Sequence, residues 1–508
     1  MPRALLTCSQ DPQPDIRWHF SDVASPAERE FLSGTDWRGR AVLVKENGCR
    51  GVFRCELPAG GAVYVKENRP GAPFDHLKGM WRVKGQMEYS AGVELHAAGI
   101  PVAVPVAWAR LGTRSWSVSR ELSEVSNFLE LVCAEGPRLV DDGGFLSALA
   151  EFSRLLIDRG VFHPDMHGGN VVVRREAGGW RFFLIDVYGA GVCGNVPHSA
   201  RVRSLIWLMP VIRRLPLAAR DDFLARALGG GDHAPQAMWP ALLSVALREA
   251  RRRWPGRKSR LLRTSSLCEA HSDSHGHWLT FTTFPLQRAV QAVESCLNNA
   301  PSTTLLKKDV KRRVMRVKDG AGTLIVKFYH RCSYRGPFRA DRRSFLAMHH
   351  LAVLGADETP TAYAWLRRPN GEGVLVMEDV GYADLRHVLA TEPDESQRRG
   401  KLRQLAELVA RWHERGIHHA DLKLTNVVVG HEGLRIVDCD DVRFPSCLPE
   451  KARAKNLRQI LENFPAGVPL RARLGFLVCY RRATGLPREW LRAFWGEVAG
   501  GVRAAASA

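Results

Sequence analysis

The sequence lacks a paired cysteine framework: its 11 cysteines are scattered, and no two stand at C-x-x-C spacing. Scattered single thiols are typical of proteins from a reducing compartment. No stretch approaches the roughly 18 apolar residues that a membrane-spanning helix needs, and residues 1–15 contain no apolar core of signal-peptide length. We therefore expect a cytoplasmic protein that can still lie peripherally on a membrane surface.

Acidic residues are comparatively few, since 53 Asp and Glu face 73 Lys and Arg, which leaves a net charge of +20. A surface of that sign attracts anions such as nucleotides, nucleic acid, anionic lipid headgroups or phosphorylated sugars. No nucleic-acid recognition motif accompanies the charge, which argues against that partner. Eight of the basic residues cluster between Arg248 and Arg263, as either a solvated helix face or a contact for an anionic surface.

One order of elements occurs twice in the chain. In the first half, residues 41–68 predict three strands with Gly-containing turns, and a helix ends before Gly99. A strand over 116–122 and an amphipathic helix over 145–160 follow. The second half repeats this order. A hairpin over 312–329 is followed by a helix that runs to Gly355, a strand over 373–379 and an amphipathic helix over 401–416.

Each half also contains a loop with the spacing H-x-D-x₄-N, HPDMHGGN (163–170) and HADLKLTN (419–426). Phosphoryl transfer needs a carboxylate that orients and deprotonates the acceptor hydroxyl, and an amide oxygen that holds Mg²⁺. This spacing provides both from one loop. The candidate catalytic carboxylates are Asp165 and Asp421, and the candidate metal ligands are Asn170 and Asn426.

Two further charged positions recur in the same order. Asp186 and Asp438 each end an apolar strand after the loop, where kinases place a second Mg²⁺ ligand. Lys66 and Lys327 each end a β-rich run upstream, as does the kinase lysine that contacts the ATP phosphates. A lysine on a buried strand is costly without an anionic partner. The ordered set predicts an ATP and Mg²⁺ site in each half.

The partner of this lysine differs between the halves. A helical glutamate normally pairs with it, and Glu88 is the candidate in the first half, with Glu94 as the second choice. The equivalent position in the second half is Ser344, so the sequence offers no obvious glutamate there. Asp341 is the alternative.

The phosphate-covering loops are also irregular, because in neither half does the segment at this place have the pattern G-x-G-x-x-G. Residues 48–51 and 307–312 stand at these places, and basic side chains there could neutralise phosphate charge instead of backbone amides. Two residues after the catalytic aspartate, the second half has Lys423, which could steady the transferred phosphoryl group, whereas the first half has His167. We therefore expect the second half to be the faster catalyst.

These patterns predict an α+β fold with two tandem protein-kinase-like bilobal domains. We place the boundary in the polar stretch that begins near Ser265. The predicted ranges are 1–264 for the first domain, with lobes of about 1–122 and 123–264, and 265–508 for the second, with lobes of about 265–379 and 380–508.

The sequence resembles the lipopolysaccharide core kinases, the Kdo/heptose kinase family of Gram-negative bacteria. The resembling segments are LLKKDVKRRVMRVKDGAGTLIVKFYHRCSYRGPFR, MEYSAGVELHAAGIPVAVPVAWA and VFHPDMHGGNVVV. The resemblance implies a protein-kinase-like fold that uses ATP and Mg²⁺ to phosphorylate a Kdo or heptose sugar of the lipid A–core acceptor at the cytoplasmic face of the inner membrane. The tandem arrangement departs from the single domain of that family.

Two other functions stay open at the level of sequence. A kinase of a small molecule or a protein, of the aminoglycoside or choline phosphotransferase type, would carry the same loop. A pseudokinase scaffold is suggested by Ser344 and by the missing glycine loops, but a scaffold need not keep H-x-D-x₄-N, and both halves do.

Overall fold

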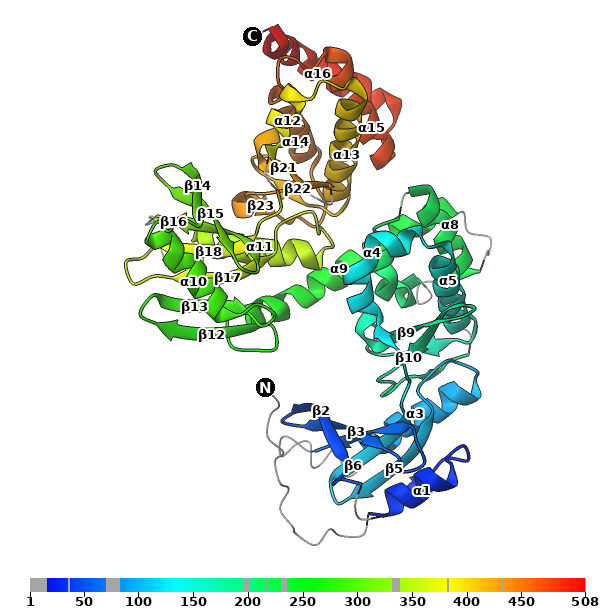
Figure 1. Ribbon diagram of the computed structural model, residues 1–508. Coiled ribbons are helices and arrows are strands. Elements are labelled where there is room, and N and C mark those ends of the chain that lie inside the picture. Colours follow the sequence, from blue (N-terminus) through cyan, green and yellow to red (C-terminus); the bar gives the residue numbers. More distant parts are fainter. Residues whose placement is uncertain are drawn as a thin grey trace. The chain divides into compact units, whose positions relative to one another are not determined.

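The computed structural model describes residues 16–34, 37–69, 83–194, 202–215, 217–229, 235–330, 339–381, 383–430 and 433–507. The chain forms two compact units, Met1–Ala246 and Leu247–Ala508 (Figure 1). Both mix helices with mainly antiparallel strands, in agreement with the predicted α+β class. Among the described residues, no helix is both long and apolar enough to cross a membrane.

Unit 1 begins with a six-stranded sheet whose strand order is β1-β5-β6-β4-β3-β2 and whose neighbours are all antiparallel. Alternate residues of β4, such as Val63 and Val65, enter the hydrophobic core, so that Lys66 lies on the opposite face. The helix α1 (Pro26–Ser33) accompanies this sheet. The strands are β1 (Trp18–Phe20), β2 (Ala41–Asn47), β3 (Arg50–Glu56), β4 (Ala62–Asn68), β5 (Pro105–Leu111) and β6 (Arg114–Arg120).

The rest of unit 1 is mostly helical. Asn127 caps α4 and Asp142 caps α5, and α5 ends just before Gly160, whose positive φ of 64° suits a helix exit. Aromatic rings of Phe128, Phe145 and other residues fill its core. The elements are α3 (Lys84–Ala97), β7 (Ser126–Asn127), α4 (Phe128–Asp141), α5 (Gly143–Asp158), β8 (Val161–Phe162), β9 (Val171–Glu176), β10 (Gly179–Leu184), β11 (Gly191–Val192), α7 (Met209–Ile212) and α8 (Leu217–Leu228).

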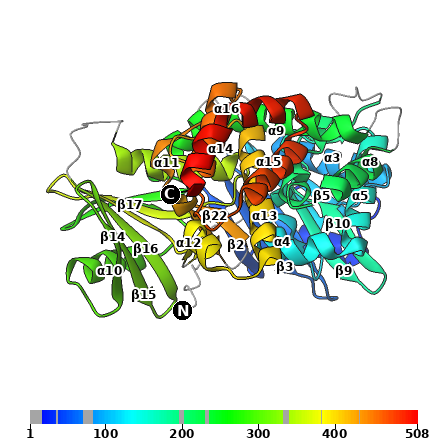
Figure 2. The ribbon, with the colours of Figure 1, turned by 90° about the horizontal axis from the view of Figure 1, so that it is seen from above.

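Unit 2 has a seven-stranded antiparallel sheet in the order β12-β13-β17-β18-β16-β15-β14. The helix α10 (Leu286–Leu297) packs its apolar side, including Ala289 and Val293, against one face of this sheet (Figure 2). Lys327 of β16 lies on the opposite face, because its neighbours Val326 and Phe328 enter that core. The strands are β12 (Cys268–Asp273), β13 (Gly276–Phe281), β14 (Thr303–Lys308), β15 (Arg312–Asp319), β16 (Gly322–Tyr329), β17 (Ala362–Arg367) and β18 (Gly373–Glu378).

Helices and short strands complete unit 2. A helix N-capped by Asp394 precedes the loop at 419–426 and ends near Gly416, as predicted. The elements are α11 (Ala340–Val353), β19 (Ala383–Asp384), α12 (Leu385–Thr391), α13 (Glu395–Glu414), β20 (His418–His419), β21 (Val427–Gly430), β22 (Gly433–Ile436), β23 (Val442–Arg443), α14 (Glu450–Glu462), α15 (Leu470–Thr484) and α16 (Arg488–Ser507).

The polar stretch after Ser265, in which we placed the domain boundary, forms β12 and β13. Most side chains of β12 are exposed, because it is the outermost strand of the sheet, and the stretch therefore has the composition of a linker. The division into compact units falls earlier, within α9 (Pro235–Leu261).

The second part of α9 is held by unit 2. The guanidinium of Arg251 donates to the backbone carbonyls of Arg415, at 3.0 Å, of Pro445, at 3.1 Å, and of Ser446, at 3.0 Å. The indole of Trp254 stacks on the ring of His350 with 4.1 Å between centroids. This part of the basic cluster is thus a packing element, and Arg251 is occupied by protein groups.

Replacing Arg251 by Ala is expected to destabilise unit 2 by about 1 to 3 kcal/mol, because three carbonyls lose a charged donor. One of these carbonyls precedes the segment that carries the 419–426 loop and two follow it, so amide hydrogen exchange in that segment should accelerate. Arg252→Ala is the matched control, since that side chain is 70% exposed and pairs only with Glu249 among the interactions described for it. Equal exchange rates in both variants would contradict the assignment.

Candidate active site

The loop with H-x-D-x₄-N spacing has the same geometry in both units. In unit 1 the amide of Asn170 donates to the backbone carbonyl of Asp165 at 2.9 Å, and in unit 2 Asn426 donates to that of Asp421 at 2.9 Å. These bonds use the amide nitrogen and fix the asparagine close to the aspartate, so that its amide oxygen can serve as a metal ligand. The aspartate and the asparagine, five residues apart in the sequence, therefore lie next to each other in the loop.

The first histidine of each loop is structural. The ring Nδ1 of His163 accepts from the backbone N–H of Asp165 at 3.3 Å, and His419 accepts from Asp421 in the same way at 3.3 Å. Burial lowers the pKa of both histidines, which keeps their rings neutral and able to accept. They orient the backbone of the loop.

The aspartate after the loop is turned out of its strand in both units. Asp186 has a φ of 58° and Asp438 a φ of 63°, in the left-handed region that aspartate tolerates better than most residues. The residue before each one donates its N–H to the loop asparagine's carbonyl at 2.9 Å. The strand end and the loop are thereby joined, and the carboxylate faces the sheet lysine.

In unit 1, Lys66 of β4 lies between two carboxylates. Its Nζ is 2.5 Å from Glu88 Oε1 on α3 and also contacts Asp186 Oδ1. Glu88 is thus the helical partner that the sequence indicated. The fallback Glu94 instead accepts from the N–H of Val192 at 2.9 Å.

In unit 2, Lys327 of β16 is more deeply buried, with 6% of its side chain exposed. Its Nζ lies 2.7 Å from Asp438 Oδ1 and 2.8 Å from Asp440 Oδ1. The hydroxyl of Tyr329 donates to Asp440 at 2.8 Å and holds that carboxylate in place. The second carboxylate therefore comes from the segment after β22 and not from α11.

Asp341, our alternative partner for Lys327, has a different role. Its carboxylate accepts from Arg339 at 2.9 Å and from the indole N–H of Trp365 at 2.9 Å. It is 2% exposed and fixes α11 to β17. The expectation that Asp341 substitutes for the glutamate is wrong, because Asp440 provides the second charge.

Electrostatics keep the two strand-end aspartates ionised. Burial alone would raise the pKa of Asp186, but Lys66 and Arg50 outweigh it and lower that pKa to about 2. Burial would also raise the pKa of Asp438, but Lys327 and Arg312 outweigh the effect of burial and lower that pKa to about 2. Although burial disfavours its charge, the pKa of Lys327 is raised by its anionic surroundings. At neutral pH Asp186 and Asp438 are therefore ionised, and Lys327 is charged.

The position two residues after each loop aspartate carries a basic side chain close to it. Lys423 Nζ lies 3.0 Å from Asp421 Oδ2, whereas His167 Nε2 lies 3.6 Å from Asp165 Oδ2. Both aspartates are at least half exposed, with 50% and 73% of the side chain accessible. They are therefore open to an acceptor molecule.

The donor set in each unit fits Mg²⁺. Asp186 with Asn170, and Asp438 with Asn426, offer carboxylate and amide oxygens, and Mg²⁺ binds such hard ligands together with substrate phosphates. The carboxylates are already deprotonated, and the amide oxygens are left available by the loop hydrogen bonds.

A buried lysine facing an ionised aspartate, beside an aspartate–asparagine loop, has the chemistry of a phosphotransferase. Residues 311–474 match the model of the Lipopolysaccharide kinase (Kdo/WaaP) family. The match contains Lys327, the loop at 419–426 and Asp438, and it lies wholly within unit 2. It identifies the protein as a kinase, which implies ATP as a substrate and usually Mg²⁺.

Proposed function

We propose that the protein transfers a phosphoryl group from ATP to a Kdo or heptose sugar of the lipopolysaccharide core. The observation that carries the proposal is the paired geometry of unit 2, where Lys327 meets Asp438 next to the loop of Asp421, inside the segment that matches the family. A bound Mg²⁺ would neutralise phosphate charge at the site.

In this proposal the roles of the side chains follow from their positions. Lys327 binds the α- and β-phosphates of ATP, Asp438 and Asn426 hold the metal ion, and Asp421 accepts the proton of the sugar hydroxyl. Lys423 places a positive charge beside that carboxylate. The corresponding residues of unit 1 are Lys66, Asp186, Asn170 and Asp165, with His167 in the place of Lys423. Glu88 is the helix carboxylate that holds Lys66.

We further propose that unit 1 arose by duplication of the same kinase domain. The support is the matching strand order: β2, β3, β4, β6, β5 and β1 of unit 1 follow each other across the sheet as β14, β15, β16, β18, β17 and β13 do in unit 2. Each unit then adds a three-stranded and a two-stranded sheet in the same chain order.

The test of the proposed reaction is incubation of the purified protein with Mg²⁺, ATP and purified lipid A–core oligosaccharide. Mass spectrometry should show the addition of one phosphoryl group to a Kdo or heptose residue. Phosphorylation of an aminoglycoside or choline in place of the core would favour the small-molecule kinase, and failure to consume ATP with any acceptor would favour a scaffold.

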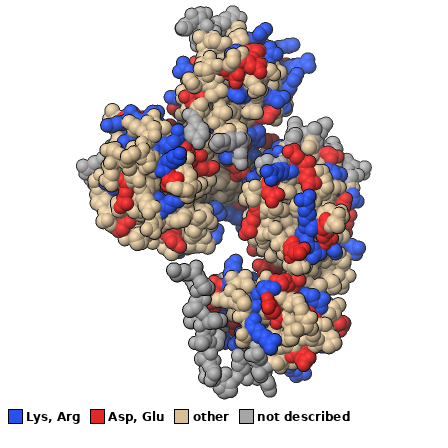
Figure 3. Space-filling model, in the orientation of Figure 1, with Lys and Arg blue, Asp and Glu red and all other residues tan. Residues whose placement is uncertain are grey.

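We also propose that the protein contacts an anionic membrane surface peripherally, through β14 and the turn that follows it. Leu305, Leu306 and Val310 are exposed there, by 52%, 44% and 95%, among exposed lysines. Apolar side chains flanked by lysines suit an anionic lipid interface. Figure 3 shows Lys and Arg side chains spread over the visible surface among Asp and Glu. Positive charge is therefore not confined to the basic cluster between Arg248 and Arg263.

Replacing Leu306 and Val310 together by Asp should reduce co-sedimentation with phosphatidylglycerol-containing vesicles by about tenfold, because apolar burial is lost and like charge is added. Replacing the exposed Val42 and Val44 of β2 by Asp is the matched control for unit 1. Unchanged sedimentation of the first variant would refute a contact through β14.

A further inference from the structure

Each unit carries one arginine in an equivalent place at the edge of the site. Arg50 begins β3 and Arg312 begins β15. On the neighbouring strand, Lys66 pairs with Val52 and Lys327 pairs with Val314. Each arginine stands two residues before that valine. Because strand residues two apart share a face, arginine and lysine lie on the same face of the sheet in both units.

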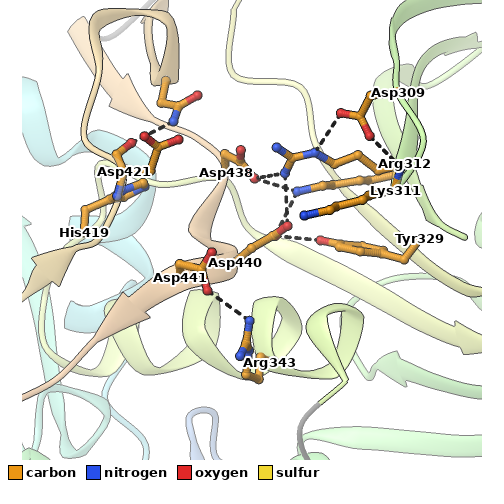
Figure 4. A network of polar contacts seen from close by, with 12 residues as sticks. Asp309, Lys311, Arg312, Tyr329, Arg343, His419, Asp421, Asp438, Asp440 and Asp441 are labelled. Carbon is orange, nitrogen blue, oxygen red and sulfur yellow. Dashed lines mark hydrogen bonds and ion pairs between the residues drawn. The ribbon is translucent and has the colours of Figure 1, made fainter. Parts of the chain in front are cut away.

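The contacts of these arginines are equivalent as well. Arg50 lies 2.9 Å from Asp186 and 3.4 Å from Glu88, the two carboxylates that hold Lys66. Arg312 lies 2.7 Å from Asp438 and 3.1 Å from its neighbour Asp440, the two that hold Lys327 (Figure 4). Each site thus pairs two carboxylates with two cations.

The backbone of the turn before Arg312 is not free to bind phosphate. Asp309 accepts from the backbone N–H groups of Lys311, at 2.8 Å, and of Arg312, at 2.9 Å. A carboxylate of the chain therefore already fills the place where the amides of a glycine-rich loop would receive an anion. Charge neutralisation at this edge falls to side chains.

We propose that Arg50 and Arg312 bind the β- and γ-phosphates of the nucleotide in place of the amides of a glycine-rich loop. This inference rests on the proposed kinase function. The guanidinium is the counter-charge of the metal-binding aspartate in each unit. When a nucleotide with its metal ion enters, Arg312 exchanges Asp438 for phosphate oxygens, which the planar guanidinium can bind in a bidentate manner.

A second arginine on each strand provides a matched control. Arg54 and Arg316 stand four residues further along β3 and β15, on the same face. Arg54 lies 2.7 Å from Glu121, and Arg316 lies 2.7 Å from Asp379, carboxylates that directly follow β6 and β18. These two ion pairs involve neither the site lysine nor the metal-binding aspartate of either unit.

The experiment compares the full chain with two double variants, Arg50→Gln/Arg312→Gln and Arg54→Gln/Arg316→Gln. Calorimetry measures the affinities for ATP and AMP in the presence of Mg²⁺. The first variant is expected to lower the ATP-to-AMP affinity ratio by roughly 10- to 100-fold, since a charge-assisted contact to phosphate is lost. The control variant should leave that ratio within about threefold, whatever it does to the affinity for both nucleotides.

Retained AMP binding reports that the variant is folded. Arg50→Lys/Arg312→Lys keeps the charge next to the two carboxylates and should give an intermediate ratio, because lysine cannot bind phosphate in a bidentate manner. An unchanged ratio in both the Gln and the Lys variants would overturn the role of the arginines and leave the kinase function standing. Absence of ATP binding by the unsubstituted chain would overturn both.

Discussion

Asp421→Asn is expected to lower phosphorylation of the core acceptor by about 100- to 10,000-fold, the usual contribution of a positioned general base. The substitution keeps the size of the side chain, and the bonds that shape the loop use the backbone of Asp421 and the side chains of His419 and Asn426. The loss should therefore appear in turnover at saturating ATP, with nucleotide affinity preserved.

The matched variant is Asp165→Asn, for which we expect a smaller loss. Lys423 brings a permanent charge to 3.0 Å from Asp421, whereas unit 1 has His167 at 3.6 Å from Asp165. Stabilisation of developing charge is usually a large part of catalysis, and one missing donor costs roughly 100- to 1,000-fold. If Asp165→Asn abolished turnover while Asp421→Asn left it intact, this ranking of the two units would be wrong.

Lys327→Met is expected to remove ATP binding by unit 2 and to lower its unfolding free energy by about 3 to 5 kcal/mol, as when one partner of a buried ion pair is lost. Among the residues that the structure describes, Arg312 is the cation that would remain beside Asp438 and Asp440, which are 20% and 13% exposed. In differential scanning calorimetry one transition should move down by on the order of 10 °C.

Lys66→Met is the companion variant in unit 1. Its partner Asp186 is 40% exposed, so water can replace part of the lost interaction and the stability loss should be smaller. A transition that stays in place in Lys327→Met would show that the buried charges are balanced in another way. An unchanged number of ATP molecules bound per chain, measured by calorimetry, would remove Lys327 from the nucleotide site.

Spacing along the chain was enough to predict the parts of the site that are short-range. The loop asparagine bonds the backbone of the aspartate five residues before it, and the strand lysines alternate with core residues, so both patterns are visible in the sequence. The position of Asp186 and Asp438 at the end of an apolar strand was also predictable, although their left-handed backbone conformation was not. These features depend on local geometry that each half repeats.

Long-range contacts account for what was missed. Asp440 stands two residues after Asp438, and only the fold brings it to Lys327, 113 residues earlier in the chain. The search for a partner was restricted to the helix that usually supplies it. In the structure Ser344 of that helix is fully buried. The hydroxyl of Tyr329 donates to Asp440, and this tyrosine thereby helps to position the carboxylate that contacts Lys327. Arg312 was considered for phosphate, but its pairing with aspartates could not be read from the sequence.

The placement of Arg251 and Trp254 within α9 has a consequence for anyone who separates the two units. A fragment that starts at residue 265 would leave the carbonyls of Arg415, Pro445 and Ser446 without their charged donor and would uncover one face of the His350 ring. A fragment that starts near Leu247 would keep the helix turns that carry these contacts. The cut at 265 should therefore give poorly soluble protein, even though every proposed catalytic residue of unit 2 is retained.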